Sequence, residues 1–220
     1  MEIKVVRQIL EWNEDCSNEI KETLKEKKVC LINVMGSPGA GKTSLILEMV
    51  KRLAPRYRAG VLEGDIAGEI DAKKMDEMGI PVVQLNTDGA CHIEAMSVQH
   101  ILPMFRLEDL DVLFVENIGN LVCPAEFDLG ADLNMMILSV PEGHDKILKY
   151  PLMFSMCDVL VVNKADYLQL PSNNFDVEFL TERMKAINPE AKVFVISAYA
   201  GDGVPELVAW LKDQVHAKRG

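Results

Sequence analysis

Several features are scarce in this sequence, and each scarcity narrows the classes of protein it can encode. No apolar run approaches the ~20 residues that cross a bilayer, and Met1–Lys4 does not begin a signal peptide. We therefore expect a cytoplasmic protein with no membrane partner. Basic residues are also few, at 23 Lys and Arg against 34 Asp and Glu. The formal net charge of −11 argues against nucleic acid as a partner, because its phosphates would be repelled.

Disulfide bonds are not expected either, because five cysteines are an odd number in a chain without an export signal. Burial or thiol chemistry must therefore explain them. Cys30 and Cys157 lie in or beside apolar segments and are expected to be small buried side chains. Cys16 lies on a charged helical segment and is expected at the surface or at an interface.

The sequence is rich in short apolar segments that alternate with helical ones. Hydrophobic residues make up 49% of the 220 residues, enough for one large globular domain with a full core. Residues 3–28 have the pattern of a charged amphipathic helix. The strands expected after it are Val29–Met35, Gly60–Glu63, Pro81–Leu85, Val112–Val115, Met135–Val140, Val159–Val162 and Lys192–Ile196. Helices are expected near 43–54, 68–78, 91–103, 175–187 and 204–217.

This alternation predicts an α/β fold: a mainly parallel sheet of about seven strands flanked by helices. We expect an N-terminal amphipathic helix at 1–28 and one domain at 29–220. Ligands of such sheets bind at the carboxyl ends of the strands, so the residues that follow each strand are the candidates for a site.

The first expected strand ends in a phosphate-binding motif. The segment Gly36-Ser37-Pro38-Gly39-Ala40-Gly41-Lys42-Thr43 matches G-x-x-x-x-G-K-[ST] in full, between a strand and a helix. Its glycines let backbone N–H groups face phosphate oxygens, and the adjacent Ser44 belongs to the same expected site. Lys42 is expected to reach the β- and γ-phosphates, and the Thr43 hydroxyl to bind Mg²⁺. The motif predicts a P-loop NTPase fold.

A second motif indicates that the base is guanine. The apolar strand at 159–162 runs into Asn163-Lys164-Ala165-Asp166, which matches the N-K-x-D signature of GTPases. The Asp166 carboxylate can accept hydrogen bonds from guanine N1–H and the 2-amino group, whereas adenine would leave it badly paired. Lys164 is expected to lie over the base, and Asn163 to tie this loop to the P-loop. Ser197 and Ala198, after the last strand, are expected to present a backbone N–H to guanine O6.

Acidic residues at two further strand ends are the candidates for the magnesium site. Asp65 follows the second strand and Glu116 the fourth, and either carboxylate can hold Mg²⁺ directly or through water. One of the two could instead be only a helix cap. With Lys42 they form the expected catalytic group for hydrolysis of GTP to GDP, and Gly119 is expected to give an N–H to the γ-phosphate. No glutamine or arginine stands in an obvious catalytic place, so we expect slow hydrolysis.

Thiols and imidazoles form a third candidate group. Cys91-His92 follows the third strand and Cys123 lies in the loop after Glu116, so all three fall at the same edge of the sheet. Two thiolates and an imidazole suit Zn²⁺, and they also suit square-planar Ni²⁺. Three ligands do not complete a site, so solvent or a second subunit must supply the rest. Each of these cysteines could equally be a buried hydrophobe. His100 is a weaker accessory candidate, and two further histidines are expected to be solvated: His144 and His216.

These motifs together resemble those of the hydrogenase nickel-incorporation GTPases, the HypB family, over nearly the whole chain. The most specific matching stretches are Glu116–Pro124, and Pro141–Lys146 running into Lys149-Tyr150-Pro151. Some members carry an N-terminal Cys-rich or His-rich metal motif, and Met1–Lys28 has neither. The sequence therefore looks like a minimal form of the family.

The resemblance implies a dimeric GTPase that helps to deliver nickel to [NiFe]-hydrogenase. It implies that Cys91, His92 and Cys123 form a metal site at the dimer interface, with nickel as cargo and zinc able to occupy the same ligands. The implied partners are a second copy of the chain, the hydrogenase large subunit and a nickel-carrying accessory protein. Our hypothesis is a coupled switch, in which GTP·Mg²⁺ orders the loops that carry Asp65 and Gly119 and thereby moves Cys123. Two lysines either reach across the dimer towards the phosphates or are solvated: Lys146 and Lys149.

Three other functions remain open on sequence alone. A urease-type nickel GTPase would carry Cys-Pro-His in this loop, whereas here Ala125 follows Cys123-Pro124. A metal-storage or scaffold protein would bind nucleotide without turnover. A P-loop small-molecule kinase would need an acceptor-substrate motif, which we do not identify, and Asn163–Asp166 argues against it.

Overall fold

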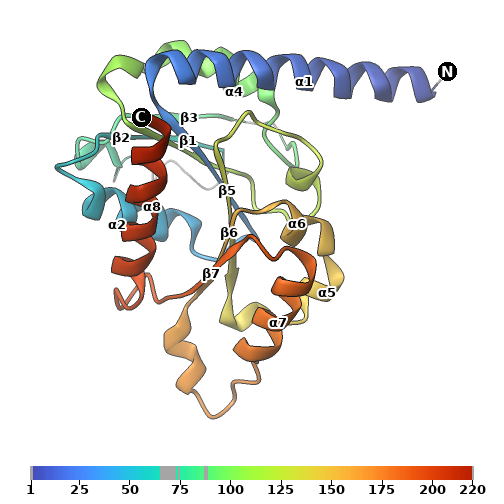
Figure 1. Cartoon of the computed structure of the whole chain (residues 1–220), viewed down its shortest axis with the longest axis vertical. Helices are drawn as coiled ribbons and strands as arrows, with labels where there is room; N and C mark the ends of the chain where they lie inside the picture. The colour runs from blue at the N-terminus through green and yellow to red at the C-terminus, as the bar shows by residue number, and fades with distance from the viewer. Residues whose placement is uncertain (1, 65–72, 74, 87–88, 220) are drawn as a thin grey trace.

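Seven parallel strands lie side by side at the centre of the computed structural model (Figure 1). The structure describes residues 2–64, 73, 75–86 and 89–219, and only the backbone of residues 2–10. The strands are β1 (Cys30–Gly36), β2 (Ala59–Glu63), β3 (Val82–Gln84), β4 (Val112–Glu116), β5 (Leu133–Ser139), β6 (Val159–Asn163) and β7 (Lys192–Val195). Their order across the sheet is β3-β2-β4-β1-β5-β6-β7. The expected fold class and number of strands are confirmed.

The sheet is covered on both faces, which explains why its central strands are continuously apolar. All residues of β1, β2, β4 and β6 are buried, whereas the edge strands β3 and β7 are partly exposed. Strands buried on both faces favour runs of Val, Ile and Leu over alternation. The strong signal of the central strands in the sequence has this physical origin.

One face of the sheet packs against α2 (Lys42–Leu53) and α8 (Val204–Arg219) (Figure 1). The opposite face packs against α1 (Glu2–Lys27) and α4 (Ala95–Ile101) on one side, and α6 (Pro151–Met156) and α7 (Val177–Ile187) on the other. Along β1 the side chains alternate between these layers, with Ile32 facing α2 and α8 and Leu31 facing α1. No helix among the described residues is long and apolar enough to cross a membrane.

Several expected boundaries differ from the structure. The helix expected at 91–103 begins only at Ala95, so Cys91 and His92 lie in the preceding loop. Two short helices were not predicted: α5 (Lys146–Lys149) and α6. Of the helix expected at 68–78, most residues lie outside the described ones, while 73 and 75–77 are helical. Short 3-10 helices, also not predicted, are Leu102–Met104, Leu107–Asp109, Cys123–Ala125, Val140–Glu142 and Ala165–Gln169.

The three cysteines expected to have no ligand role are all buried. Cys30 and Cys157 lie in the core as predicted, and burial raises the pKa of each thiol to about 12, which makes them poor nucleophiles. Cys16 was expected at the surface or at an interface, and the surface position is wrong. Its side chain belongs to the buried cluster that α1 shares with α4 and the sheet, together with Ile20 and Leu24, because this face of the helix docks on the core.

Candidate nucleotide and metal site

The P-loop wraps around the carboxyl end of β1 and opens α2. Gly39 and Gly41 have φ of 75° and 94°, a left-handed conformation that glycine adopts without strain. Gly41 is the N-cap of α2, and as a glycine it has no side chain to cap the first N–H groups. The first N–H groups of a helix lack intrahelical acceptors, and together with the helix dipole they favour an anion. The backbone thus has the form that a phosphate chain requires.

Lys42 and Thr43 extend this form towards a magnesium-nucleotide complex. Lys42 is buried, with Nζ 3.5 Å from the Gly36 carbonyl oxygen and 3.4 Å from that of Ser37, so it lies along the P-loop. The Thr43 hydroxyl donates to Glu116 Oε1 at 2.8 Å. A hydroxyl and a carboxylate in contact beside a P-loop fit a magnesium site. Asp65, the other expected ligand, lies outside the described residues.

The guanine motif is held against the P-loop by its asparagine. Asn163 Nδ2 donates to the Ala40 carbonyl at 2.9 Å, in the way expected for this residue. A Cβ added to Gly41 would lie only 2.4 Å from the same Nδ2, so the close approach requires glycine there. Lys164 has φ of 61°, and its Nζ donates to the Gly39 carbonyl at 2.7 Å. Asp166 accepts from Ser197 Oγ at 2.6 Å.

These elements line one cavity of about 350 Å³, whose lining includes Gly41, Ser44, Asn163, Lys164 and Ala198. The structure therefore brings the P-loop and the guanine motif together around a single space. The Ala198 N–H donates to Asn163 Oδ1 at 3.1 Å, and the Ser197 N–H to the Asp202 carbonyl at 2.9 Å. Both donors already have acceptors here, so the contact to guanine O6 stays a prediction.

The loop after β4 lies directly on the P-loop. A Cβ at Gly119 would come within 2.6 Å of the Pro38 ring, and Asn120 pairs with Gly36 in an antiparallel bridge. The expected contact of Gly119 with a γ-phosphate is consistent with this position. The same loop continues to Cys123, so one short segment joins the Glu116 carboxylate to a thiol.

The three expected metal ligands meet at this edge of the sheet. Donor atoms of Cys91, His92 and Cys123 all lie within 4.8 Å of one another, although Cys91 and Cys123 are far apart in sequence. Cys91 Sγ is 3.4 Å from His92 Nδ1. His92 Nε2 is buried and has no hydrogen-bond partner among the described residues. That nitrogen lies 4.0 Å from Glu94 Oε1, and the other ring nitrogen is the one beside the Cys91 thiol. Two thiols and an imidazole this close together are a donor set that Zn²⁺ or Ni²⁺ accepts.

The electrostatics of these groups agree with a metal-binding role. Burial lowers the pKa of His92 against the opposing charges of Glu94 and Glu126, which favours the neutral imidazole that binds metals. Phe127 stacks on this ring with centroids 4.1 Å apart. The hydrogen bond with Cys123, followed by burial, raises the pKa of the Cys91 thiol. A divalent cation would reverse that shift, because it stabilises thiolates.

Other candidate residues lie outside this cluster. His100 is exposed on α4, and its Nδ1 lies 3.0 Å from the Met96 carbonyl, so it does not belong to the donor group. His216 is exposed, as expected. His144 is only partly solvated: its Nδ1 accepts from the Asp176 N–H at 3.0 Å, and its half-buried ring packs edge-on against two phenylalanines, Phe175 and Phe179.

Lys146 and Lys149 have partners within this chain. Lys146 Nζ lies 5.6 Å from the centroid of the Tyr150 ring, and Lys149 pairs with Asp145 at 2.5 Å. Both lysines lie on α5, and their role across a dimer stays a prediction.

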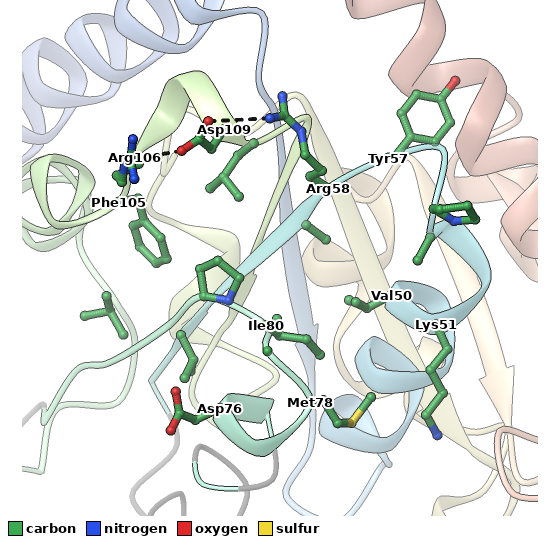
Figure 2. A pocket seen from close by; sticks show the side chains of 18 of the residues that line it. Val50, Lys51, Tyr57, Arg58, Asp76, Met78, Ile80, Phe105, Arg106 and Asp109 are labelled. Atoms are coloured by element: carbon green, nitrogen blue, oxygen red, sulfur yellow. Dashed lines mark ion pairs between the residues drawn. The ribbon is translucent and has the colours of Figure 1, made fainter.

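A larger pocket than the one at the nucleotide motifs lies away from them. Its volume is about 940 Å³, and it opens at the amino-terminal ends of β2 and β3, between α2 and the segment around Phe105 (Figure 2). Arg58 and Arg106 at its rim both pair with Asp109, as the dashed lines in Figure 2 show. None of the expected site residues lines it. The volume of a pocket is therefore no guide to the nucleotide motifs in this structure.

Sequence reasoning missed a set of residues that support the site. Phe127 was not singled out, and Asn117 and Asn120 were noticed only as part of a matching stretch. A signal was present for another asparagine: Asn33 interrupts the apolar run of β1, and a buried amide in such a run needs a partner.

The fold and the geometry of this edge define a P-loop nucleotide-binding protein with a cluster of metal-ligand side chains beside its nucleotide motifs. The family model of the CobW/HypB/UreG nucleotide-binding domain matches residues 30–195. The hydrogenase maturation factor HypB of Azotobacter vinelandii is 41% identical over 214 residues, covering 96% of this chain and 69% of that protein. The chain belongs to the CobW/HypB/UreG family and, within it, to the HypB hydrogenase maturation factors.

Two solved structures agree with this assignment. The crystal structure of HypB from Helicobacter pylori in complex with nickel superposes with a TM-score of 0.88 at 34% identity, covering 94% of this chain and 96% of that one. The crystal structure of HypB from Archaeoglobus fulgidus also superposes with a TM-score of 0.88, at 32% identity, covering 94% of this chain and all of that one. The predicted family resemblance is confirmed.

Proposed function

We propose that this protein is a GTP-hydrolysing metallochaperone that binds nickel and assists its insertion into [NiFe]-hydrogenase. One observation carries the proposal: the Glu116–Cys123 loop contacts the P-loop at one end and supplies a metal-ligand thiol at the other. A loop that reaches both sites is the simplest physical means of making metal binding depend on the nucleotide.

In this proposal the nucleotide is GTP, bound with Mg²⁺ at Thr43 and Glu116, with Asp65 as a further candidate. Mg²⁺ would neutralise charge on the β- and γ-phosphates, and Lys42 would act on the same oxygens. Asp166 would select guanine, and its contact with Ser197 holds the carboxylate in place. Hydrolysis is expected to be slow, because the sequence offers no obvious residue to orient the attacking water.

The cargo in this proposal is Ni²⁺ at Cys91, His92 and Cys123, and Zn²⁺ can occupy the same ligands. Its partners would be a second copy of the chain, the hydrogenase large subunit and a nickel-carrying accessory protein, in the cytoplasm, where thiols stay reduced. The nickel complex of the Helicobacter pylori relative supports the choice of metal. Three ligands in one chain leave the coordination incomplete, which supports a site completed by solvent or by the second copy.

The test is a nickel and zinc titration in the nucleotide-free, GDP-bound and GTP-analogue-bound states, with oligomer size and GTP turnover measured in parallel. We expect a metal affinity and a size that differ between states, and turnover that is lost in Lys42→Ala. Identical affinity and size in all three states would remove the switch. Turnover unaffected by Lys42→Ala would contradict GTP hydrolysis at this P-loop. Nucleotide binding with no turnover in the wild-type protein would favour a storage or scaffold role.

A further inference from the structure

Two asparagines of the Glu116–Cys123 loop contact the backbone on either side of His92. Asn120 Nδ2 donates to the Cys91 carbonyl at 3.2 Å, and Asn117 Oδ1 accepts from the Ile93 N–H at 3.2 Å. These bonds span 29 and 24 positions in sequence. The segment that carries two of the metal ligands is therefore held by the loop that carries the third.

Asn117 is the fixed contact of the two. Its side chain is buried, and Nδ2 donates to Asn33 Oδ1 at 3.0 Å, while Asn33 Nδ2 donates to Asn134 Oδ1 at 3.0 Å. This row of amides joins the residue that follows β4 to the two adjacent strands β1 and β5, at the centre of the sheet. Networks of satisfied buried hydrogen bonds rigidify the groups that belong to them. Ile93 is thus tied to a buried hydrogen-bond network at the centre of the sheet.

Asn120 is the contact that depends on the P-loop. Its side chain is half-buried, its Oδ1 accepts from the Val122 N–H at 2.8 Å, and its backbone pairs with Gly36. It therefore lies between the start of the phosphate-binding loop and the Cys91 carbonyl. A displacement of this part of the loop would reach Cys91 through one hydrogen bond.

We propose that Asn117 and Asn120 are positioning residues that make the Cys91-His92 segment pivot about His92, with the Ile93 end held to the sheet and the Cys91 end carried by the loop that senses the nucleotide. The inference rests on the proposed function, since it names how nucleotide state reaches that metal site. Loop movement displaces Cys123 directly and Cys91 through Asn120, so two of the three donors follow the nucleotide while His92 stays in place.

Asn120 is the residue to substitute, because it is only half-buried and touches none of the metal donor atoms. Asn120→Ala removes both of its side-chain bonds. Asn120→Ser is the matched variant, since a serine hydroxyl can still accept from the N–H two residues on but is too short to reach Cys91. The control is Asn188→Ala, which removes amide donors to the Ser155 and Cys157 carbonyls at the opposite end of the strands.

The first measurement uses nucleotide-free protein loaded with Co²⁺ as a spectroscopic probe and with Ni²⁺ for affinity. Both Asn120 variants should shift the Co²⁺ ligand-field bands and raise the Ni²⁺ dissociation constant by about 2- to 10-fold, the effect of losing one hydrogen bond that orients a ligand. Asn188→Ala should match the wild-type protein in both. Wild-type spectra and affinities in the two Asn120 variants would overturn the proposal, as would a change in Asn188→Ala of the same size.

The second measurement is the ratio of Ni²⁺ affinities between the GDP-bound and GTP-analogue-bound states. Both Asn120 variants should bring this ratio measurably closer to 1 without abolishing it, because Cys123 still moves with the loop, and nucleotide affinity should be unchanged. A serine variant that behaves like the wild-type protein would show that the loop turn matters and the Cys91 contact does not, and would overturn the proposal. If the wild-type ratio is itself 1, the proposed switch fails, and the nucleotide-free spectra still decide the role of Asn120.

Amide hydrogen exchange tests the fixed end separately. The Ile93 N–H should be strongly protected and equally so with GDP and with the GTP analogue, because Asn117 holds it to the sheet. Protection at Ile93 that changes with nucleotide would contradict the pivot.

Discussion

The Asp166 carboxylate is the side chain on which the choice of base depends. Its two oxygens match two donors of guanine, and an amide in its place would set an N–H against one of them. Asp166→Asn should therefore weaken GTP binding by about two to three orders of magnitude and favour xanthosine triphosphate, whose O2 is an acceptor. Titration with fluorescent GDP and XDP measures this.

Lys42→Ala is the control for the change of base, because it should weaken both nucleotides alike through the phosphates. If Asp166→Asn left the order of preference between guanine and xanthine nucleotides unchanged, Asp166 would not read the base.

Cys123 is the ligand that should separate metal binding from nucleotide binding. Cys123→Ala removes one of three donors and touches neither the P-loop contacts nor Glu116, so we expect nickel affinity to fall by at least about tenfold with GTP binding largely intact. Cys157→Ala is the matched control, since that thiol is buried in the core. Isothermal titration with each ligand checks both. Unchanged nickel affinity in Cys123→Ala would remove the coupled site.

The side chains of the nucleotide motifs were predictable from sequence because each motif is a short contiguous pattern. Gly36–Thr43 spans eight residues and Asn163–Asp166 spans four. The contacts that join the motifs were not predictable, because Asn120 reaches Cys91 only when β4 and β3 end at the same edge of the sheet. Asn163 was predicted to hold the P-loop, but the asparagines that hold the metal segment follow no known spacing. The packing of His144 likewise depends on Phe179, on a helix that comes later in the chain.

The boundaries of some helices depend on tertiary contacts that the local sequence pattern does not show. At the start of α4, Asn13 Oδ1 of α1 accepts from the Ala95 N–H at 3.1 Å, so the cap of this free N–H comes from 82 residues away. Sequence reasoning placed the start four residues too early because no such cap is visible locally. α5 and α6 have only four and six residues, separated at Tyr150, so neither contains enough turns for a periodic signal.

Docking of α1 depends on Gly130. This residue has φ of 75°, and a Cβ there would lie 2.6 Å from the Ser17 carbonyl oxygen, in the backbone of α1. Gly130→Ala should therefore combine backbone strain with displacement of the helix. Gly79→Ala is the matched control, because Gly79 has φ of 71° and no atom within 4 Å of the added Cβ. Strain alone in the control should lower the free energy of unfolding by about 1–2 kcal/mol.

Urea unfolding of the two variants separates these effects. Gly130→Ala should lose clearly more stability than Gly79→Ala, and limited proteolysis should cut its α1 faster. Equal losses in the two variants would mean that the helix accommodates the extra methyl group without moving.

Asp111 joins segments from three parts of the chain. Its carboxylate accepts from the Arg58 N–H at 2.7 Å and pairs with the Arg219 guanidinium at the end of α8. Burial alone would raise the pKa of Asp111, but the hydrogen bonds from Arg58 and the charge of Arg219 hold it below its usual value. A carboxyl whose pKa is lowered by folding stabilises the protein above its unfolded-state pKa of ~3.9, and this contribution is lost as the pH falls through the folded-state value.

Asp111→Asn should therefore destabilise the protein by about 1.5–3 kcal/mol at neutral pH, the range for hydrogen bonds to a charged group. The difference from the wild-type protein should shrink below about pH 4, where the Asp111 carboxyl of the unfolded wild-type protein begins to be protonated. Asp109→Asn is the control, because its half-exposed ion pairs with Arg58 and Arg106 are worth at most about 1 kcal/mol. Denaturant unfolding at pH 7 and pH 3 measures both, and a difference that grows on acidification would contradict the assigned direction.

A dimer of the proposed kind needs an apolar surface near the metal ligands, and α5 and α6 supply one. Leu148, Leu152 and Met156 recur every four residues with exposed fractions of 56%, 49% and 47%, and α6 contacts the 3-10 helix that begins at Cys123. Leu148→Ser with Leu152→Ser should weaken the metal- and nucleotide-dependent dimer by about tenfold or more, as loss of central apolar contacts does. Met104→Ser, at 68% exposure on the opposite end of the strands, is the control. Analytical ultracentrifugation decides the matter: if the double variant dimerises like Met104→Ser, this surface is not where the second copy binds, and the missing ligands must come from solvent.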